Sequence, residues 1–180
     1  MEGLHIREAR PGDWPGLWAI MEPVLRSGET YCWDTTASED AARPLWLEPA
    51  PAVVFVAELD GTVAGTAQLH PNRPGNGSHV ANASFMTGTA FTGRGIARAL
   101  AEHVLAEAAR RGYRSMQFNA VVETNTRAVR LWQSLGFRIL ATVPEAFRHP
   151  RHGLTGLHIM HRSLTEGETA PDRDGESVRE

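Results

Sequence analysis

A glycine-rich turn at residues 92–97, Thr-Gly-Arg-Gly-Ile-Ala, joins a strand-like run to a helix-like run near the middle of the chain. The strand-like run covers residues 80–89, and the helix-like run covers residues 96–111. A helix leaves its first backbone N–H groups without partners, and its dipole favours negative charge at that end. Glycine also lets a ligand approach the backbone closely. The turn therefore predicts a site for a phosphate-bearing cofactor.

The order of elements around this turn restricts the fold class. Strands are expected at residues 4–7, 53–59, 62–69, 80–89, 115–121, 137–143 and 157–162, with helices after positions 13, 38, 95 and 125. This order is typical of an α/β protein with a mixed sheet. Four strands come before the long helix that follows the turn, which argues against a doubly wound nucleotide fold.

Local signals fix several boundaries. Asp13, Ser38 and Asn125 each stand where a side chain can cap the helix that follows. Leu45 is expected on the apolar face of the second helix, together with Ala42 and Trp46. An Asp-Gly pair at positions 60 and 61 predicts a hairpin. Residues 144–156 are rich in Arg and His and are expected to form a loop.

Length and composition fit one globular domain. The 180 residues predict a domain over residues 1–164 and a polar, disordered tail over residues 165–180. The net charge of −3 gives no general attraction to nucleic acid or to an anionic membrane. The longest apolar run, residues 52–57, is too short to cross a bilayer. The first residues lack the pattern of a signal peptide, so we expect a cytoplasmic protein.

Residue usage excludes several kinds of site. All 18 basic residues are arginine, which excludes a Schiff base on lysine and a P-loop. Cys32 is the only cysteine, so an internal disulfide is excluded, and we expect its thiol to be packed rather than nucleophilic. The histidines at positions 149, 152, 158 and 161 lack a compact metal-ligand pattern, and we expect no metal site.

The glycine turn alone leaves alternatives open. A dinucleotide site needs Gly-x-Gly-x-x-Gly after the first strand of its unit, and here the third glycine is missing. The turn also comes halfway along the chain. A turn without any ligand is the other alternative.

Two motifs together resemble the GNAT superfamily of N-acetyltransferases. The turn is similar to that family's acetyl-coenzyme A signature, Gln/Arg-x-x-Gly-x-Gly/Ala, with Thr92, Gly95 and Ala97 at the three defined positions. Residues 125–137 are similar to the family's Asn-x-x-Ala…Leu-Gly-Phe helix. The resemblance covers residues 4–163. A weaker resemblance, at residues 4–7, residues 28–31 and the fourth strand, is to the branch that acts on amino-acid analogues such as phosphinothricin.

The resemblance implies the GNAT fold, a mixed and mostly antiparallel sheet of about seven strands flanked by helices. In that fold a bulged fourth strand splays from the fifth, and the pantetheine arm of acetyl-coenzyme A (acetyl-CoA) lies in the gap. Backbone N–H groups at positions 94–97 would hold the pyrophosphate, with two Arg side chains nearby. The implied cofactor-binding residues are Phe85, Met86, Thr87, Thr92, Gly93, Arg94, Gly95, Ile96, Ala97, Arg98, Asn119, Asn125, Ala128 and Trp132.

The implied reaction is direct attack of an amine on the acetyl thioester, for which a base must take the amine proton. Trp132 stands where many relatives place an acidic Tyr, and it is expected to pack against the arm or the core instead. Asn82 stands where some relatives place a Glu base, and an amide cannot act as a base. His79 and Glu123 are the replacement candidates, so the predicted catalytic positions are His79, Asn82 and Glu123.

Four residues, Glu29, Tyr31, Trp33 and His70, fall where relatives close the acceptor pocket. An acid and aromatic side chains together suit a cationic amine, and core packing of the aromatics is the alternative. We expect acetyl transfer to the primary amine of a small molecule or an amino-acid-like acceptor. The alternatives are acetylation of a protein N-terminus and a non-catalytic acyl-CoA-binding sensor. Relatives also imply a homodimer.

Overall fold

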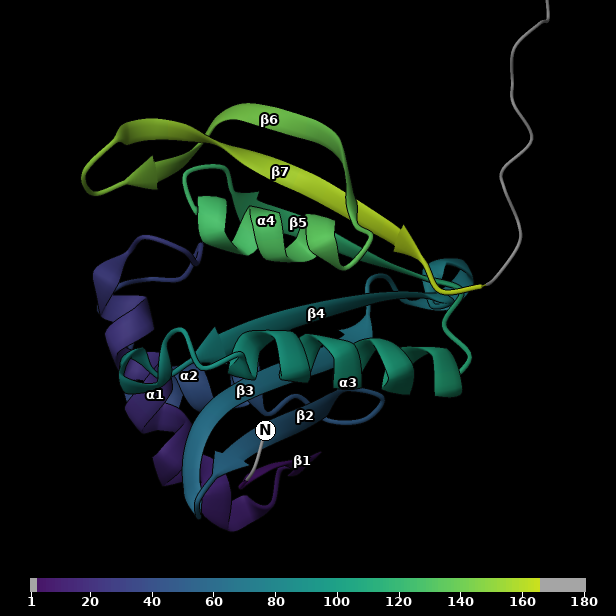
Figure 1. The fold of residues 1–180 in the computed structure, drawn as a ribbon. Helices are drawn as coiled ribbons and strands as arrows, with labels where there is room; N and C mark the ends of the chain where they lie inside the picture. Colours follow the sequence, from purple (N-terminus) through teal and green to yellow (C-terminus); the bar gives the residue numbers. More distant parts are fainter. Residues whose placement is uncertain (1–2, 166–180) are drawn as a thin grey trace, which may run out of the picture.

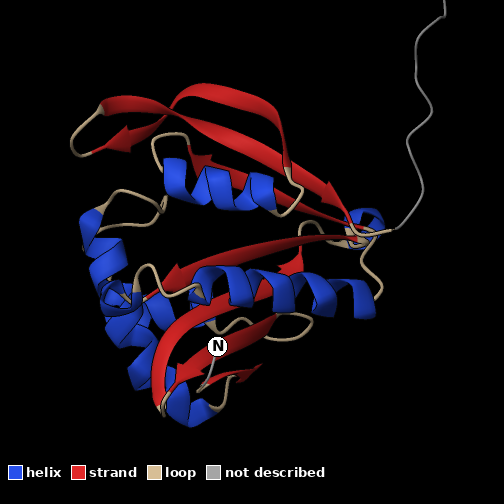
Figure 2. Cartoon of the chain, viewed as in Figure 1, coloured by secondary structure: helices blue, strands red, loops and turns tan. Residues whose placement is uncertain are grey.

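The computed structural model describes residues 3–165, in which seven strands form one sheet in the order β1-β2-β3-β4-β5-β7-β6. Every neighbouring pair is antiparallel except β4 with β5 (Figures 1 and 2). This confirms the mixed, mostly antiparallel sheet that we expected. The strands are β1 (Leu4–Glu8), β2 (Val53–Leu59), β3 (Thr62–Pro71), β4 (Val80–Thr87), β5 (Ser115–Val122), β6 (Arg138–His149) and β7 (Gly153–Ser163).

In the described part of the chain, four α-helices cover the sheet: α1 (Trp14–Ser27), α2 (Glu39–Trp46), α3 (Ile96–Arg110) and α4 (Thr126–Ser134). α3 and α4 pack on one face, while α1 and α2 pack on the other. α3 buries residues at positions 96, 100, 104 and 108, because that spacing forms one stripe along a helix. No helix among residues 3–165 is long and apolar enough to cross a membrane.

The local signals are only partly confirmed. Ser38 and Asn125 cap their helices by accepting backbone N–H bonds from Ala41 and Ala128. The prediction that the Asp13 side chain caps the following helix was wrong. Its carboxylate instead accepts two hydrogen bonds from the Arg7 guanidinium, at 2.7 and 2.9 Å. Leu45 is 53% exposed, since the buried face of α2 follows the four-residue spacing of Ala42 and Trp46.

The loop expected over residues 144–156 is wrong. These residues extend β6 and β7 into a long hairpin whose turn lies between His149 and Gly153. Phe147 pairs with Thr155 and both are buried, as is His149 two positions further along the strand. Arg148 and Arg151 are exposed and only a few positions, such as Phe147 and His149, are buried, so the composition of this segment looks like that of a loop. The predicted tail lies outside the described residues from position 166 onward.

The parallel pair at the centre of the sheet is short and then opens. β4 and β5 pair only at Val80 with Ser115 and at Ala81 with Met116. Beyond these positions the two strands diverge, as Figure 1 shows between the labels β4 and β5. β4 ends at Thr87, two residues earlier than expected, and a single 3-10 turn (Thr89–Phe91) leads into the glycine turn. The predicted gap between the fourth and fifth strands is thus confirmed.

Candidate functional site

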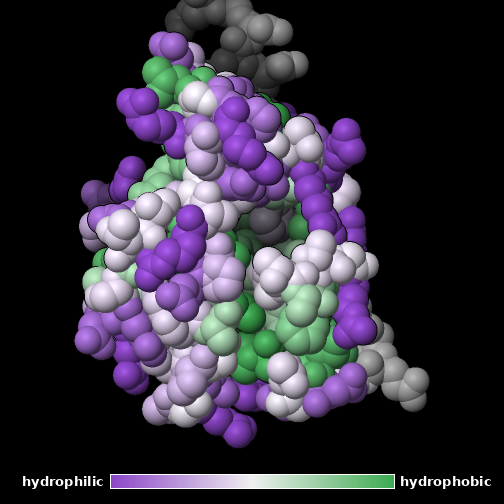
Figure 3. All heavy atoms as spheres, turned by 90° about the vertical axis from the view of Figure 1, so that its left-hand side faces the viewer, coloured by the Kyte–Doolittle hydropathy of each residue, from purple (hydrophilic) through white to green (hydrophobic). Residues whose placement is uncertain are grey.

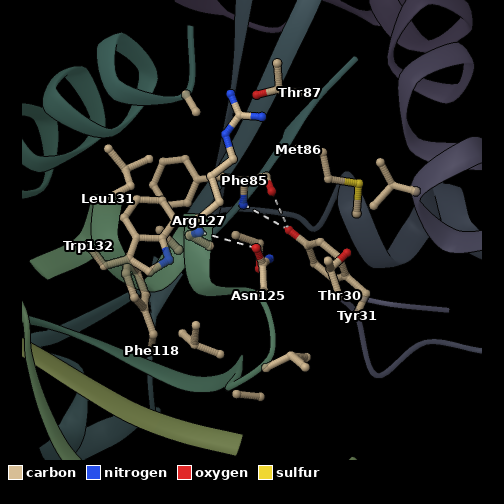
Figure 4. A pocket seen from close by; sticks show the side chains of 18 of the residues that line it. Thr30, Tyr31, Phe85, Met86, Thr87, Phe118, Asn125, Arg127, Leu131 and Trp132 are labelled. Carbon is tan, nitrogen blue, oxygen red and sulfur yellow. Dashed lines mark hydrogen bonds between the residues drawn. The ribbon is translucent and has the colours of Figure 1, made fainter. Parts of the chain in front are cut away.

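A cavity of about 740 Å³ lies where β4 and β5 separate. Figure 3 shows the hollow from the side on which the gap opens, and Figure 4 shows its lining. Its walls come from both strands, from the glycine turn, from α4 and from the loop between α1 and α2. They comprise Val24 and residues 30–33, 82–87, 91–93, 95–98 and 118–122, together with Asn125, Arg127, Ala128, Leu131 and Trp132.

One end of the cavity is the N-terminus of α3. Gly93 and Gly95 have φ angles of 84° and 75°, a left-handed conformation that favours glycine. Gly95 is the N-cap residue, so the N–H groups of the following turn have no intrahelical acceptor. The N–H of Arg94 already donates to the Phe91 carbonyl at 3.3 Å, and Arg94 does not line the cavity. The donors left for an anion are therefore those of Gly95 and the first helical residues.

Two arginines lie at this end. Arg98 lines the cavity, where its guanidinium donates to the Ser134 hydroxyl at 2.6 Å and lies 3.5 Å from Glu102. Arg127 reaches the cavity from the first turn of α4, and a Cβ on Gly93 would lie 4.0 Å from its Nη2. In Figure 4 the Arg127 side chain runs into the cavity from α4, and its guanidinium points toward Thr87. We did not predict Arg127 from the sequence, because its role depends on how α4 is oriented toward the gap.

An aromatic cluster forms the wall beside β5 and α4. Trp132 lies 4.9 Å from Phe85 and 5.0 Å from Phe118 between ring centroids, and Phe118 stacks on Phe137 at 4.3 Å. Trp132 is only 8% exposed. The structure therefore places it in the core as well as at the cavity, where packing was the expected role.

Two of the amide side chains that line the cavity, those of Asn119 and Asn125, already have hydrogen-bond partners. The Asn125 side chain accepts from the Ala128 N–H at 3.3 Å, which is its cap bond. The Asn119 amide donates to Asn72 at 2.7 Å and accepts from Gln117 at 2.9 Å. Asn119 thus ties β5 to the residue that follows β3.

Of the three predicted catalytic residues, only Asn82 lines the cavity. His79 is exposed and precedes β4, where its carbonyl accepts from the Arg114 N–H. The Glu123 carboxylate accepts the Gly156 N–H at 2.6 Å, which joins the end of β5 to β7. Within residues 3–165, no Asp, Glu or His lines the cavity.

The acceptor-side residues divide into two groups. Tyr31 and Trp33 line the cavity, together with Thr30 and Cys32. Glu29 instead pairs with Arg151 at the tip of the β6–β7 hairpin, 2.8 Å away. His70 Nδ1 lies 2.9 Å from the Pro71 carbonyl and does not reach the cavity. Cys32 is exposed rather than packed, so that expectation was wrong.

The Tyr31 side chain extends from the loop between α1 and α2 to β4, where its hydroxyl binds the backbone of Phe85. It donates to the Phe85 carbonyl at 2.7 Å and accepts from the Phe85 N–H at 3.0 Å (Figure 4). Burial raises the pKa of Tyr31 above its ordinary value, which favours the protonated hydroxyl further, so that it can donate as well as accept. Among residues 3–165 no group of His, Cys, Asp and Glu could hold a metal ion.

The structure combines a glycine turn, a helix N-terminus and a parallel pair of strands that opens. This combination is typical of a transferase that binds an acyl-CoA, and comparison with known proteins agrees. Residues 14–137 match the model of the Acetyltransferase (GNAT) family, and the chain belongs to this family.

Three relatives illustrate the similarity. N-acetyltransferase aca1 of Schizosaccharomyces pombe is 35% identical over 143 residues, which are 71% of this chain and 68% of that protein. A GCN5-related N-acetyltransferase from Kribbella flavida is 52% identical, with a TM-score of 0.86 over 90% of this chain and 98% of that one. YncA of Salmonella typhimurium, solved with its cofactor acetyl-CoA, is 27% identical, with a TM-score of 0.76 over 94% and 98% of the two chains.

Proposed function

We propose that the protein transfers an acetyl group from acetyl-CoA to the primary amine of a small or amino-acid-like acceptor. The observation that carries this proposal is a single cavity of about 740 Å³ that runs from the N-terminus of α3 into the unpaired part of β4 and β5. One end of the cavity has helix N–H groups for a pyrophosphate, and the other end is lined by open strand edges for the arm, which is what acetyl-CoA requires. The YncA structure, which holds acetyl-CoA, supports the same cofactor for this chain.

The residues present fit the phosphate end of this cofactor. Gly95 and the N–H groups that follow it can bind a pyrophosphate, because the left-handed glycine keeps side-chain atoms away from the backbone. Arg127 and Arg98 add positive charge beside the same turn. A planar guanidinium binds phosphate through two parallel hydrogen bonds.

The other end of the cavity fits the arm and the acyl group. Backbone groups on the open edge of β4 can bind amides, as a neighbouring strand would. The cluster of Phe85, Phe118 and Trp132 makes an apolar wall that excludes water. When bound, acetyl-CoA supplies an activated acetyl thioester, and a backbone N–H in a dry site can polarise its carbonyl.

Few side chains in the cavity could take the proton from the attacking amine. Asn82 is a polar side chain in the cavity that can orient an amine or a water but cannot take its proton. His79 and Glu123 remain hypotheses for the base, and each would have to act through water. The homodimer and the cytoplasmic location expected from the sequence also remain predictions.

Release of free thiol from acetyl-CoA, measured over a panel of amines, tests the proposal. We expect turnover with at least one class of small amine or amino acid. Turnover only with peptides that have a free N-terminus would support the N-terminal acetyltransferase instead. Binding of acetyl-CoA without turnover on any amine would support the acyl-CoA-binding sensor and contradict the proposal.

A further inference from the structure

Tyr31 uses one hydroxyl to satisfy two backbone groups of a single residue. The oxygen accepts from the Phe85 N–H at 3.0 Å and donates to the Phe85 carbonyl at 2.7 Å. Tyr31 belongs to the 28–38 loop, the segment that joins α1 to α2, and it is 54 residues from Phe85 in sequence. This contact is therefore a tertiary one that fastens the 28–38 loop to the edge of β4.

The backbone of Phe85 faces the gap. Along a strand, backbone groups alternate between its two neighbours. The Val80 carbonyl and the Gly88 N–H bond to residues on the β3 side, Asn72 and Ala64, at 2.7 and 2.9 Å. The His79 carbonyl bonds on the β5 side, to Arg114. Odd-numbered residues of β4 thus face β5, which has moved away before position 85 is reached.

The place of Phe85 along the gap points to the acyl end of the cofactor. Thr87, the next odd-numbered residue, lies nearest the glycine turn that would hold the pyrophosphate. Phe85 is one gap-facing position further from that turn. An arm that starts at the turn and runs along β4 reaches Phe85 after Thr87. On the proposed function, on which this inference rests, the Phe85 N–H is then the donor that meets the acetyl carbonyl.

We propose that Tyr31 occupies the acetyl-carbonyl site of the free protein and must be displaced when acetyl-CoA binds, but not when CoA binds. CoA has no carbonyl beyond its sulfur, so the Tyr31 hydroxyl can keep both bonds to Phe85 while CoA lies in the rest of the cavity. Tyr31 therefore sets the preference between the acetylated and the spent cofactor. Its return to Phe85 after transfer would favour release of the product amide.

The test is a calorimetric titration of Tyr31→Phe with acetyl-CoA and with CoA. The variant keeps the ring and removes only the hydroxyl. We expect its Kd for acetyl-CoA to fall by about tenfold, since a typical hydrogen bond changes an equilibrium by a factor of about 2 to 10 and two are involved. The Kd for CoA should stay within about twofold of the wild-type value. The ratio of the two Kd values is the readout, because a general loss of structure would weaken both ligands together.

Tyr113→Phe is the matched control, because Tyr113 is the other tyrosine of the chain and does not line the cavity. It should leave both Kd values unchanged. An unchanged Kd ratio in Tyr31→Phe, or weaker binding of acetyl-CoA, would overturn the role of Tyr31 and leave the proposed function standing. Failure of the wild-type protein to bind either ligand would overturn the proposed function itself.

Discussion

Two glycines set the geometry at the start of α3. Gly93 and Gly95 lie in the left-handed region of φ, which costs a residue with a side chain about 1–2 kcal/mol. These positions keep the backbone turned so that the first helical N–H groups open into the cavity. Both features are local in sequence, which is why residues 92–97 could predict a phosphate site, whereas assigning it to acetyl-CoA also needed the motif at residues 125–137.

Replacing Gly95 with Val should abolish measurable acetyl-CoA binding, because it adds a branched side chain where the pyrophosphate would lie. Gly112→Val is the matched control. Gly112 has a φ of 85°, follows α3 at its other end, and a Cβ added there would meet no atom within 4 Å. Both variants should lose similar thermal stability, and only Gly95→Val should lose the ligand in calorimetry. Wild-type affinity in Gly95→Val would contradict the phosphate site.

The predicted catalytic and acceptor-pocket residues could not be placed in the same way, because their surroundings are set by distant parts of the chain. The Glu123 carboxylate accepts a hydrogen bond from the Gly156 N–H, and the Glu29 carboxylate forms an ion pair with Arg151. Each partner lies in the hairpin that the sequence suggested was a loop. A titratable residue near a motif is thus a weak signal until its tertiary partner is known.

At the scale of elements, the C-terminal end of α3 is tied to β1 through charges. Glu107 binds Arg110 at 2.7 Å and Arg111 at 3.1 Å, and Arg111 also reaches Glu8 at 2.8 Å. These hydrogen bonds, first that from Arg110, lower the pKa of Glu107 from 4.5 to about 2. The position of α3, and with it the glycine turn, depends partly on this end.

Stability should therefore fall in acid as Glu107 takes up a proton. The folded pKa lies below the unfolded one, so the contribution is complete above pH 4.5 and is lost as the pH approaches 2. Glu107→Gln should lower the free energy of unfolding at pH 7 by about 1 kcal/mol, because its partner Arg110 is largely exposed, and should flatten the pH dependence in that window. Denaturant unfolding at several pH values measures this.

Glu22→Gln is the control for that series, because the Glu22–Arg26 pair is exposed and worth little. We expect it to behave like the wild type at every pH. An unchanged slope between pH 4.5 and 2 in Glu107→Gln would show that other carboxylates dominate acid unfolding.

At the scale of the whole molecule, the β6–β7 hairpin is the part that the sequence predicted least well. β6 is an edge strand and exposes Ile139, Leu140 and Val143, at 36%, 55% and 45%. Edge strands with exposed apolar side chains are suited to pairing with another chain. Because charged and apolar residues mix along this hairpin, its position at the edge of the sheet could be recognised only from the fold.

The predicted homodimer can be tested on this strand. We expect a dimer by light scattering at micromolar concentration, and we expect Leu140→Arg to shift it toward monomer. Leu45→Arg is the control, since Leu45 is 53% exposed on α2, away from the hairpin. A wild-type monomer, or a Leu140→Arg variant that dimerises as well as the control, would contradict this interface.

The most direct test of the proposed site is a crystal structure of the protein grown with acetyl-CoA. We predict the pyrophosphate at the N–H groups that follow Gly95, the arm between β4 and β5, and the acetyl carbonyl on the Phe85 N–H with Tyr31 moved away. A cofactor bound outside the gap, or a gap that stays empty at saturating acetyl-CoA, would contradict the assignment of this cavity.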